Sequence, residues 1–389
     1  NMSTTTVRTS GIRMPVKPLK AALATLNKAR LKKGKASILD GIYFQDGHLR
    51  VTDLEIELQW NARISKYFEL AVPFKELEAA LKTAKPSDTV LISHDPTDAA
   101  MAIVTHPQAT IRVKRMDFDQ VPPYTDAEEL GKPILLPMLD SDILDLLPFV
   151  STDANRYVLN SVLLDPKGCF VACDGRTLLR IPSAELLDLK HKVMLPLKTM
   201  ELFKSKPMHE RPASLQLLMR RRSKPSKFGD EADFAQIVLG DGEWTVTTKL
   251  VEGNFPNYEQ VIPKDMPGWV GFLDVDNAKQ IAGFLGALPK DCWVRFNIDG
   301  GKITMTTTNG HTPECSTTLN VMTPSEESVE VTFNRTFLLD TIAAECLTWK
   351  IKDDLSPLLA TGRLGRTAIV MPLRTEKSAA KKEDKTEAA

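Results

Sequence analysis

The sequence lacks the short motifs on which the common enzyme classes are built. It has no Walker A loop, no Gly-x-Gly-x-x-Gly fingerprint, no His-Glu-x-x-His pair and no Gly-x-Ser-x-Gly elbow. Histidine is scarce, with 6 residues in a chain of 389, and none of them stands in a recognisable acid–base setting. These absences argue against an enzyme, and the sequence gives no reason to expect a cofactor.

Long apolar runs and a disulfide framework are also missing. No run of about 18 apolar residues, the length needed to cross a bilayer, occurs in the chain. The N-terminus is polar and basic without the apolar core of a signal peptide, and Asn1 before Met2 resembles a cloning remnant. The cysteines are odd in number and fall mostly in expected strands or helices: Cys169, Cys173, Cys292, Cys315 and Cys346. We therefore expect a reduced, cytoplasmic protein without a membrane partner.

The formal net charge of the chain is zero, because 50 Lys and Arg residues balance 50 Asp and Glu residues. The molecule as a whole therefore does not attract nucleic acid, and the distribution of charge matters more than its sum. Residues 1–39 contain nine basic residues and no acidic one. Within them, Val16, Leu19, Leu23 and Leu26 fall on one helical face. This pattern predicts a helix over 16–29 that packs on one side and exposes cations on the other.

A tandem pattern fills the chain. A helical stretch, a strand pair around a turn, and a second helix led in by an extended segment recur about every 120 to 135 residues. The three copies are 16–29, 38–58 and 72–92; 136–150, 158–182 and 195–207; and 272–288, 294–310 and 331–350. A chain of 389 residues is too long for one ordinary core, and the repeat selects three domains.

The strand signals define the fold class. Alternating β-branched residues around Asp46-Gly47 and Asp299-Gly300 are typical of β-hairpins. Each copy thus combines helices with several antiparallel strands, an α+β arrangement in which helices cover one sheet face. Proline-rich linkers are expected near 118–133 and 254–269. The predicted domains are 12–130, 131–263 and 264–374, between a disordered N-terminus (1–11) and a disordered tail (375–389).

A few local groupings suggest other chemistry. Cys169 and Cys173, with His311 and Cys315, have spacings that could supply four zinc ligands. Strand alternation instead places Cys169 and Cys173 on one face as ordinary small core residues. A cysteine- or metal-dependent hydrolase would require Cys173, Asp174 and His311 to converge, and it stands as a second class of hypothesis.

Basic residues recur beyond the first helix. The run 220–227 lies between two expected strands and is typical of a solvated hairpin excursion. The basic first helix is the better candidate for phosphate contact, since its cations share one amphipathic element. The helix expected at the start of the second copy differs from the first helix, because it carries Asp140, Asp142 and Asp145 and no basic residue.

Four separated segments resemble a known family. They are the strand pair 38–58, the segment 155–182, the stretch 249–263 and the ending 369–374. With the three-fold repeat, they resemble the bacterial DNA polymerase III beta subunit, the replicative sliding clamp, over residues 12–374. Members of that family are head-to-tail homodimers whose six domains close a ring around duplex DNA, with helices lining the hole and antiparallel sheets outside.

The resemblance implies a non-catalytic processivity factor. It would tether the DNA polymerase III alpha subunit, the clamp loader and other clamp-motif proteins to double-stranded DNA. Sequence-independent DNA contact is expected at Lys20, Lys28, Arg30, Lys33, Lys198 and Lys204. The homodimer is expected to join domain one to domain three through Ile111, Val113, Phe284, Leu285 and Leu288. Loose phosphate contacts suit a protein that must travel along DNA, because base contacts or tight ion pairs would pin it.

The resemblance also implies a partner-peptide pocket between domains two and three. Its expected residues are Leu159, Gly175, Arg176, Leu178, Pro263, Ile369, Val370, Met371, Pro372, Leu373 and Arg374. Aliphatic walls and an adaptable methionine suit the Leu and Phe anchors of a Gln-Leu-x-Leu-Phe-like motif. Val370 and Met371 also fit an ordinary terminal strand. Because Arg176 replaces the usual histidine of the family, we expect altered selectivity, with acidic residues beside the anchors favoured.

A monomeric relative of the clamps is the closer alternative. Such a protein would bind peptides without encircling DNA, and its size in solution would distinguish it from a dimer. The family tends to end soon after Met-Pro-Met-Arg-Leu, whereas this chain continues for fifteen residues beyond Arg374.

Overall fold

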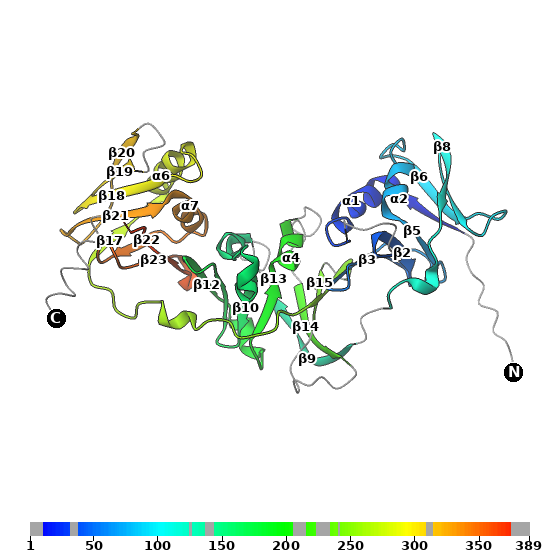
Figure 1. Ribbon diagram of the computed structural model, residues 1–389, viewed down its shortest axis with the longest axis horizontal. Coiled ribbons are helices and arrows are strands. Elements are labelled where there is room, and N and C mark those ends of the chain that lie inside the picture. Colours follow the sequence, from blue (N-terminus) through cyan, green and yellow to red (C-terminus); the bar gives the residue numbers. More distant parts are fainter. Residues whose placement is uncertain are drawn as a thin grey trace. The chain divides into compact units, whose positions relative to one another are not determined.

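The computed structural model describes residues 11–31, 38–123, 127–136, 144–204, 215–222, 234–239, 242–308 and 314–374. By its internal contacts the chain divides into two compact units (Figure 1). Unit 1 comprises residues 1–140 and 198–250, and unit 2 comprises residues 141–197 and 251–389. Within the described residues, no helix is long and apolar enough to cross a membrane.

Unit 1 contains two antiparallel sheets. The first has the strand order β1 (Gly11–Pro15), β6 (Thr89–His94), β7 (Met101–His106) and β8 (Ala109–Lys114). The second has eight strands in the order β5 (Leu70–Pro73), β2 (Gly41–Gln45), β3 (His48–Thr52), β4 (Ile56–Asn61), β16 (Trp244–Lys249), β15 (Phe234–Leu239), β14 (Leu215–Arg222) and β9 (Ala127–Leu136). Helices α1 (Val16–Leu26) and α2 (Phe74–Ala80) belong to this unit, and α4 (Leu197–Met200) begins at its boundary.

Unit 2 repeats this pair of sheets. Its eight-stranded sheet has the order β13 (Val193–Pro196), β10 (Ser161–Asp165), β11 (Cys169–Cys173), β12 (Thr177–Pro182), β24 (Thr367–Val370), β23 (Leu358–Thr361), β22 (Thr348–Ile351) and β17 (Trp269–Phe272). The four-stranded sheet has the order β20 (Ser316–Asn320), β19 (Lys302–Thr307), β18 (Trp293–Asp299) and β21 (Ser328–Asn334). Helices α6 (Val275–Ala287) and α7 (Arg335–Ala343) lie side by side (Figure 1).

Short 3-10 turns connect these elements. They are η1 (Ile38–Asp40), η2 (Phe118–Gln120), η3 (Leu147–Phe149), η4 (Ala154–Leu159), η5 (Ala184–Asp188), η6 (Glu201–Lys204), η7 (Tyr258–Gln260) and η8 (Arg363–Gly365).

Local sequence accounts for the main helices and hairpins. In α1, the four residues of the predicted apolar face are at most 2% exposed, so the expected burial is confirmed. The helix starts after Pro15, whose extended backbone cannot belong to it, and ends at Leu26 rather than at residue 29. Asp46 and Gly47, with φ of 51° and 87°, form the two-residue turn between β2 and β3. Positive φ at both central residues is the pattern of a type I′ turn, whose twist matches that of the strands it joins.

The threefold repeat appears in the order of elements. One strand, one helix, four strands, a second helix and three strands occur as β1 to β8 and again as β17 to β24. The middle copy, β9 to β16, has the same strand order, and its first helical segment is described only from residue 144. The predicted α+β class is therefore confirmed.

Each eight-stranded sheet joins strands of two successive copies. In unit 1, β4 of the first copy pairs with β16 of the second. In unit 2, β12 of the second copy pairs with β24 of the third. The two compact units therefore cut across the predicted domains, since a continuous sheet binds halves of neighbouring copies together. The predicted boundary after residue 130 also falls inside β9, which pairs with β14 of the second copy.

Candidate peptide-binding site and basic helices

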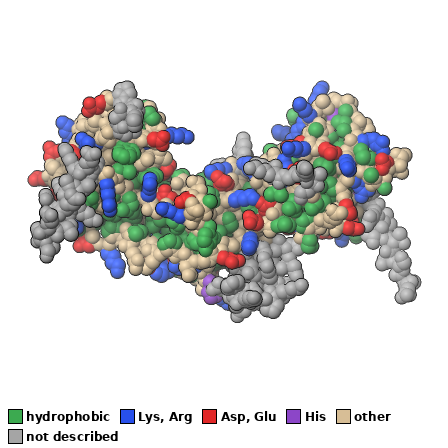
Figure 2. Space-filling view, viewed as in Figure 1, with side chains coloured by type: hydrophobic (Ala, Val, Ile, Leu, Met, Phe, Trp, Pro, Cys, Tyr) green, Lys and Arg blue, Asp and Glu red, His purple; other side chains and the backbone are tan. Residues whose placement is uncertain are grey.

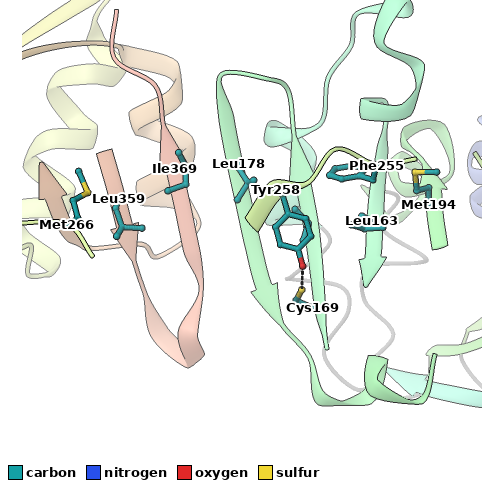
Figure 3. Packing of buried hydrophobic residues seen from close by; sticks show 10 residues of the cluster. Leu163, Cys169, Leu178, Met194, Phe255, Tyr258, Met266, Leu359 and Ile369 are labelled. Atoms are coloured by element: carbon teal, nitrogen blue, oxygen red, sulfur yellow. Dashed lines mark hydrogen bonds between the residues drawn. The ribbon is translucent and has the colours of Figure 1, made fainter. Parts of the chain in front are cut away.

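A buried apolar cluster in unit 2 lies where β12 meets β24 (Figure 3). Its members come from β10, β11, β12, β13, β23 and β24 and from the segment that follows β16: Leu163, Cys169, Val171, Leu178, Met194, Phe255, Tyr258, Met266, Leu359 and Ile369. Half-buried hydrophobic residues pack against it: Val158, Leu159, Cys173, Val251 and Ile262. A side chain inserted beside these half-buried residues would gain apolar contact on an already formed surface.

Several predicted pocket residues meet in this cluster. Leu178 stands directly opposite Ile369 in the β12–β24 ladder, and both are at most 2% exposed. Leu159 lies at the edge of the cluster, and half-buried Pro263 follows Ile262. Two predicted pocket residues, Leu178 and Ile369, thus belong to the cluster, and a third, Leu159, packs against it.

The turn between β11 and β12 forms a polar rim. The Asp174 carboxylate accepts hydrogen bonds from the backbone N–H groups of Arg176 (2.8 Å) and Thr177 (2.6 Å). Gly175 has a φ of +87°, and a Cβ placed there would lie 2.5 Å from a guanidinium nitrogen of Arg156. This position therefore requires glycine both for its backbone and for the close approach of Arg156.

Arg156 and Tyr157 are rim residues that the sequence interpretation did not single out. The Arg156 guanidinium donates to the carbonyl oxygen of Asp174 at 3.1 Å and pairs with Asp153 at 3.6 Å. Tyr157 is 60% exposed and lies against Gly253. Both belong to the segment 155–182 that supports the family resemblance, but only the contacts of Arg156 with the turn at Gly175 and of Tyr157 with Gly253 reveal their position.

The segment that follows β24 divides between core and surface. Val370 is fully buried and belongs to the core around the terminal strand β24. Met371 is 41% exposed, and its backbone N–H donates to the Arg176 carbonyl at 2.9 Å. The N–H of half-buried Leu373 donates to the Thr332 carbonyl at 2.8 Å. Pro372 is half-buried and Arg374 is exposed. One backbone bond thus ties the predicted pocket segment to the rim, and a second ties it to β21.

A polar network lies beneath the cluster. The Tyr258 hydroxyl donates to the buried Asp165 carboxylate at 3.1 Å and lies 3.3 Å from the Cys169 sulfur (Figure 3). Lys192 approaches the same carboxylate at 3.5 Å. Burial raises the pKa of Tyr258, and the hydrogen bond with Cys169 acts in the same direction. The phenol therefore stays protonated and fixes the segment around Tyr258 on the sheet.

The cysteines behave as core residues. Cys169 belongs to the apolar cluster and Cys173 packs against it, as strand alternation predicted. Burial raises the pKa of the Cys173 thiol, which disfavours the thiolate that a nucleophile or zinc ligand needs. Among the residues that the structure describes, no group of three His, Cys, Asp or Glu side chains could hold a metal. His311, the remaining residue of the hydrolase hypothesis, lies outside the described residues.

The predicted DNA-contact residues differ in their availability. Lys28 is exposed beside the end of α1. Lys20 donates to the Ala84 carbonyl at 2.7 Å, and Lys204 lies 3.4 Å from Glu201. The Lys198 ammonium pairs with Asp53. Lys33 and most of the run 220–227 lie outside the described residues, as do the side chains of 220–222. Basic side chains gather over the part of unit 1 that contains α1 and α2 (Figure 2).

Arg30 has a structural position rather than an open surface. It is 6% exposed, its guanidinium pairs with Asp40, and its Nε donates to Asn27 at 2.7 Å. The same group lies 4.8 Å from the centre of the Phe74 ring. The helix ends before Arg30, so the turn that follows directs this cation into the protein.

The predicted dimer residues are also partly core residues. Ile111 and Phe284 are half-buried, whereas Val113, Leu285 and Leu288 are at most 8% exposed. Leu285 is fully buried on the inner face of α6. An acidic replacement of Leu285 would therefore disrupt the fold of unit 2 and could not report on association alone.

The chain is similar in sequence to bacterial beta sliding clamps. It is 30% identical to the Proteus mirabilis protein over 140 residues, which are 34% of this chain and 38% of that protein. A longer alignment, 22% identical over 337 residues, covers 83% of this chain and 76% of the clamp of Chlamydia trachomatis. No protein-family model matches the chain.

Solved structures extend the similarity to the fold. The DnaN sliding clamp of Bartonella birtlesii, solved with griselimycin, matches 94% of this chain and 100% of its own with a TM-score of 0.77 at 19% identity. The Helicobacter pylori beta clamp, solved with a DNA ligase peptide, matches with the same coverages, a TM-score of 0.75 and 16% identity. The chain therefore has the sliding-clamp fold.

Titration of Asp340 should change the stability of this part of unit 2. Burial raises the pKa of Asp340 from 3.8 to about 6, and the nearby Asp174 acts in the same direction while Arg335 opposes it. Between these two pH values the folded protein holds a proton that the unfolded chain has lost, so stability falls as pH rises through this window. We expect Asp340→Asn to be more stable than the parent at pH 7 and to lose this slope.

Urea unfolding at several pH values between 4 and 8 would measure the effect. Asp265→Asn, which removes an exposed carboxylate from a loop of the same unit, serves as the control. Parallel pH profiles for the parent protein and Asp340→Asn would contradict the assignment.

Proposed function

We propose that this chain is a beta sliding clamp, a non-catalytic processivity factor whose homodimeric ring encircles double-stranded DNA in the cytoplasm. Its partners would be the DNA polymerase III alpha subunit, the clamp loader and other proteins with a clamp-binding motif. The observation that carries the proposal is the match of 94% of the chain to solved clamps with TM-scores near 0.77. We divide the chain into three clamp domains and place the first boundary before β9 rather than after residue 130.

The internal repeat supports a head-to-tail dimer. At two junctions, the strands β4 and β12 pair with β16 and β24 of the following copy. In the third copy, the strand that corresponds to β4 and β12 is β20. In the first copy, the strand that corresponds to β16 and β24 is β8. Both pair on one side only within the described residues. If β20 of one protomer paired with β8 of another, the two four-stranded sheets would form a third junction of the same kind, and a second such contact would close a ring.

The register of this contact can be transferred from the β4–β16 junction. The turn before β20 is closed by a bond from Thr307 N–H to the Cys315 carbonyl, equivalent to those from Asp53 to Ile56 and from Asp174 to Thr177. Cys315 is therefore the counterpart of Ile56, and Thr318 that of Gln59, three residues later.

The same reasoning applies to β8. Val113 is the last buried residue of its strand and corresponds to Thr248 of β16, so Thr110 corresponds to Thr245. Because Thr245 stands opposite Gln59, we propose that Thr110 stands opposite Thr318 of the second protomer.

DNA contact in this proposal uses exposed cations of the first copy's helices. Lys28, with exposed Lys17 on α1 and Lys82 after α2, can approach phosphates without losing an internal partner that the structure describes. Such contacts add attraction without selecting a sequence, as a protein that slides along DNA requires. Arg30 is not included, because it is buried and paired with Asp40.

Partner binding in this proposal uses the cluster around Leu178 and Ile369. Exposed Met371 and Tyr157 would cover an inserted Leu or Phe side chain, and Arg156 and Arg176 provide positive charge at the rim. The Helicobacter pylori clamp, which was solved with a DNA ligase peptide, supports a peptide as the ligand. The two arginines favour motifs with an acidic residue beside the apolar anchors.

Interruption of strand β8 should open the ring. The N–H of Thr110 points away from β7, so Thr110→Pro removes no ladder hydrogen bond within its own sheet but prevents one to a second protomer. We expect the parent protein and Thr110→Ala to be dimers that stay on nicked circular DNA and slide off after linearisation. Thr110→Pro should be a folded monomer that is not retained.

Light scattering, circular dichroism and gel filtration of the DNA complexes would measure these properties. A parent protein that is monomeric at every concentration would instead support the monomeric peptide-binding relative. Equal retention on circular and linear DNA would contradict topological binding.

Removal of the segment after β24 should abolish partner binding. We expect a Gln-Leu-x-Leu-Phe-like peptide to bind the parent with a micromolar dissociation constant, about 8 kcal/mol of free energy. Truncation before Met371 removes that side chain and the backbone bonds of Met371 and Leu373, so calorimetry should detect no binding while the dimer persists. Truncation after Arg374 is the matched control and should leave the affinity unchanged. Equal affinities for the two truncated proteins would eliminate this site.

A further inference from the structure

Building on the proposed dimer, we propose that Glu76, Asn277 and Gln280 act as displaceable caps on the two strand edges that join between protomers. Each donates or accepts a hydrogen bond at a backbone group that the partner strand would otherwise use. Closure of the ring would exchange these side-chain bonds for inter-strand bonds, and opening would restore them.

Two caps cover the edge of β20. The Asn277 side-chain amide donates to the Asn320 carbonyl at 2.9 Å, and the Gln280 amide donates to the Thr318 carbonyl at 3.3 Å. The Cys315 carbonyl accepts from Thr307 of the neighbouring strand and therefore points inward. Backbone groups alternate in direction along a strand, so the carbonyls of Thr318 and Asn320 point to the open side. In the register proposed above, Thr318 stands opposite Thr110 of β8 and Asn320 opposite Gln108 just before it, so the two amides occupy acceptors that this segment of a second protomer would need.

The third cap covers the edge of β8. The Lys114 N–H donates to the Glu76 carboxylate of α2 at 3.1 Å. The next residue, Arg115, donates inward to the Ala100 carbonyl, so the N–H of Lys114 points to the open side. At the two intact junctions the corresponding N–H groups bond to the adjoining strand segment: Lys249 to the Glu55 carbonyl and Met371 to the Arg176 carbonyl. Glu76 thus substitutes for a strand carbonyl.

Among the described residues, the counterparts of the caps at the intact junctions do not bind strand edges; the first helical segment of the second copy, described only from residue 144, is left out of this comparison. Asn277 and Gln280 are the third and sixth residues of α6, and the same positions of α1 are Pro18 and Ala21, which have no side-chain donor. Glu76 is the third residue of α2, and its counterparts are Thr199 of α4 and Phe337 of α7. Thr199 bonds to the Thr248 hydroxyl instead. Within the part of the chain compared, side chains that can cap a strand edge lie next to β8 and β20, the two edges that have no neighbouring strand.

The physical role of such caps follows from the cost of an open edge. Outward N–H and C=O groups are a template for pairing with any extended chain, and proteins commonly cover them. A cap forms a hydrogen bond with an outward backbone N–H or C=O group while the ring is open, and this bond is lost when the ring closes. The cap therefore stabilises only the separated edges. It therefore weakens the dimer and reduces the cost of opening, which suits a ring that must be opened to load on DNA.

The dimer dissociation constant of cap variants tests this directly. Removing Glu76 and Gln280 by alanine substitution raises the free energy of the separated edges alone, so the double variant should dimerise more tightly. Closure of the ring breaks four bonds of these two caps, two at each of its two interfaces. At about 0.5 kcal/mol for each exposed hydrogen bond, we expect a decrease in the dissociation constant of roughly thirtyfold, measured by sedimentation or by exchange of labelled subunits. Asn277 is left intact, because it also belongs to the capping box of α6.

Matched variants separate capping from other effects. Glu78→Ala and Lys279→Ala remove exposed charges from the same helices, and Glu76→Gln keeps an acceptor, so all three should leave the dissociation constant near that of the parent. In the monomeric Thr110→Pro background, Glu76→Ala should speed hydrogen exchange of the Lys114 amide, whereas in the dimer it should not. An unchanged or larger dissociation constant for the double variant would overturn the capping role, while a monomeric parent protein would overturn the proposed dimer itself.

Discussion

Antiparallel pairing between the edge strands of half-sheets from successive repeats is the interaction on which the rest of this structure depends. Each repeat contributes two half-sheets that end in a strand with outward N–H and C=O groups, and burying such groups without partners is costly. Pairing β4 with β16 and β12 with β24 satisfies them and creates two continuous eight-stranded sheets. The compact units are therefore junctions between repeats rather than repeats. The remaining half-sheets, which end at β8 and β20, are where the same pairing is unmet within the described chain.

The candidate peptide site is a consequence of one of these junctions. Leu178 and Ile369 belong to different repeats and become neighbours only because β12 pairs with β24. The equivalent place at the β4–β16 junction holds Glu57 and Thr247 opposite each other, and Glu57 forms a buried ion pair with Arg50 at 2.7 Å. A charged pair cannot receive an apolar anchor without losing its compensation. This difference is why we propose a peptide site at the β12–β24 junction and not at the β4–β16 junction.

The sequence was sufficient to predict the structural features that local periodicity or the family resemblance determines. The apolar face of α1 and the hairpin at Asp46-Gly47 follow from residue patterns and are present in the structure, and the resemblance named Leu178 and Ile369, which meet in the buried cluster. Arg30 was expected on the basic surface but is buried, because α1 ends at Leu26 and the helical period no longer gives its direction. Leu285 lies in the core of unit 2, since periodicity alone cannot distinguish an inner helix face from an interface. The rim position of Arg156 was not predicted, because it depends on a contact with Gly175 that no local sequence pattern encodes.

The central claim, that β8 of one protomer pairs with β20 of another as β16 pairs with β4, is tested most directly by crosslinking. Opposite residues of a hydrogen-bonded antiparallel pair have Cα atoms about 5.5 Å apart, within reach of a disulfide. A protein carrying Thr110→Cys and Thr318→Cys should form a covalent dimer on mild oxidation, whereas each single variant and the slipped pair Thr110→Cys with Leu319→Cys should not. Absence of a crosslink in the matched pair, or equal crosslinking in the slipped pair, would contradict the account.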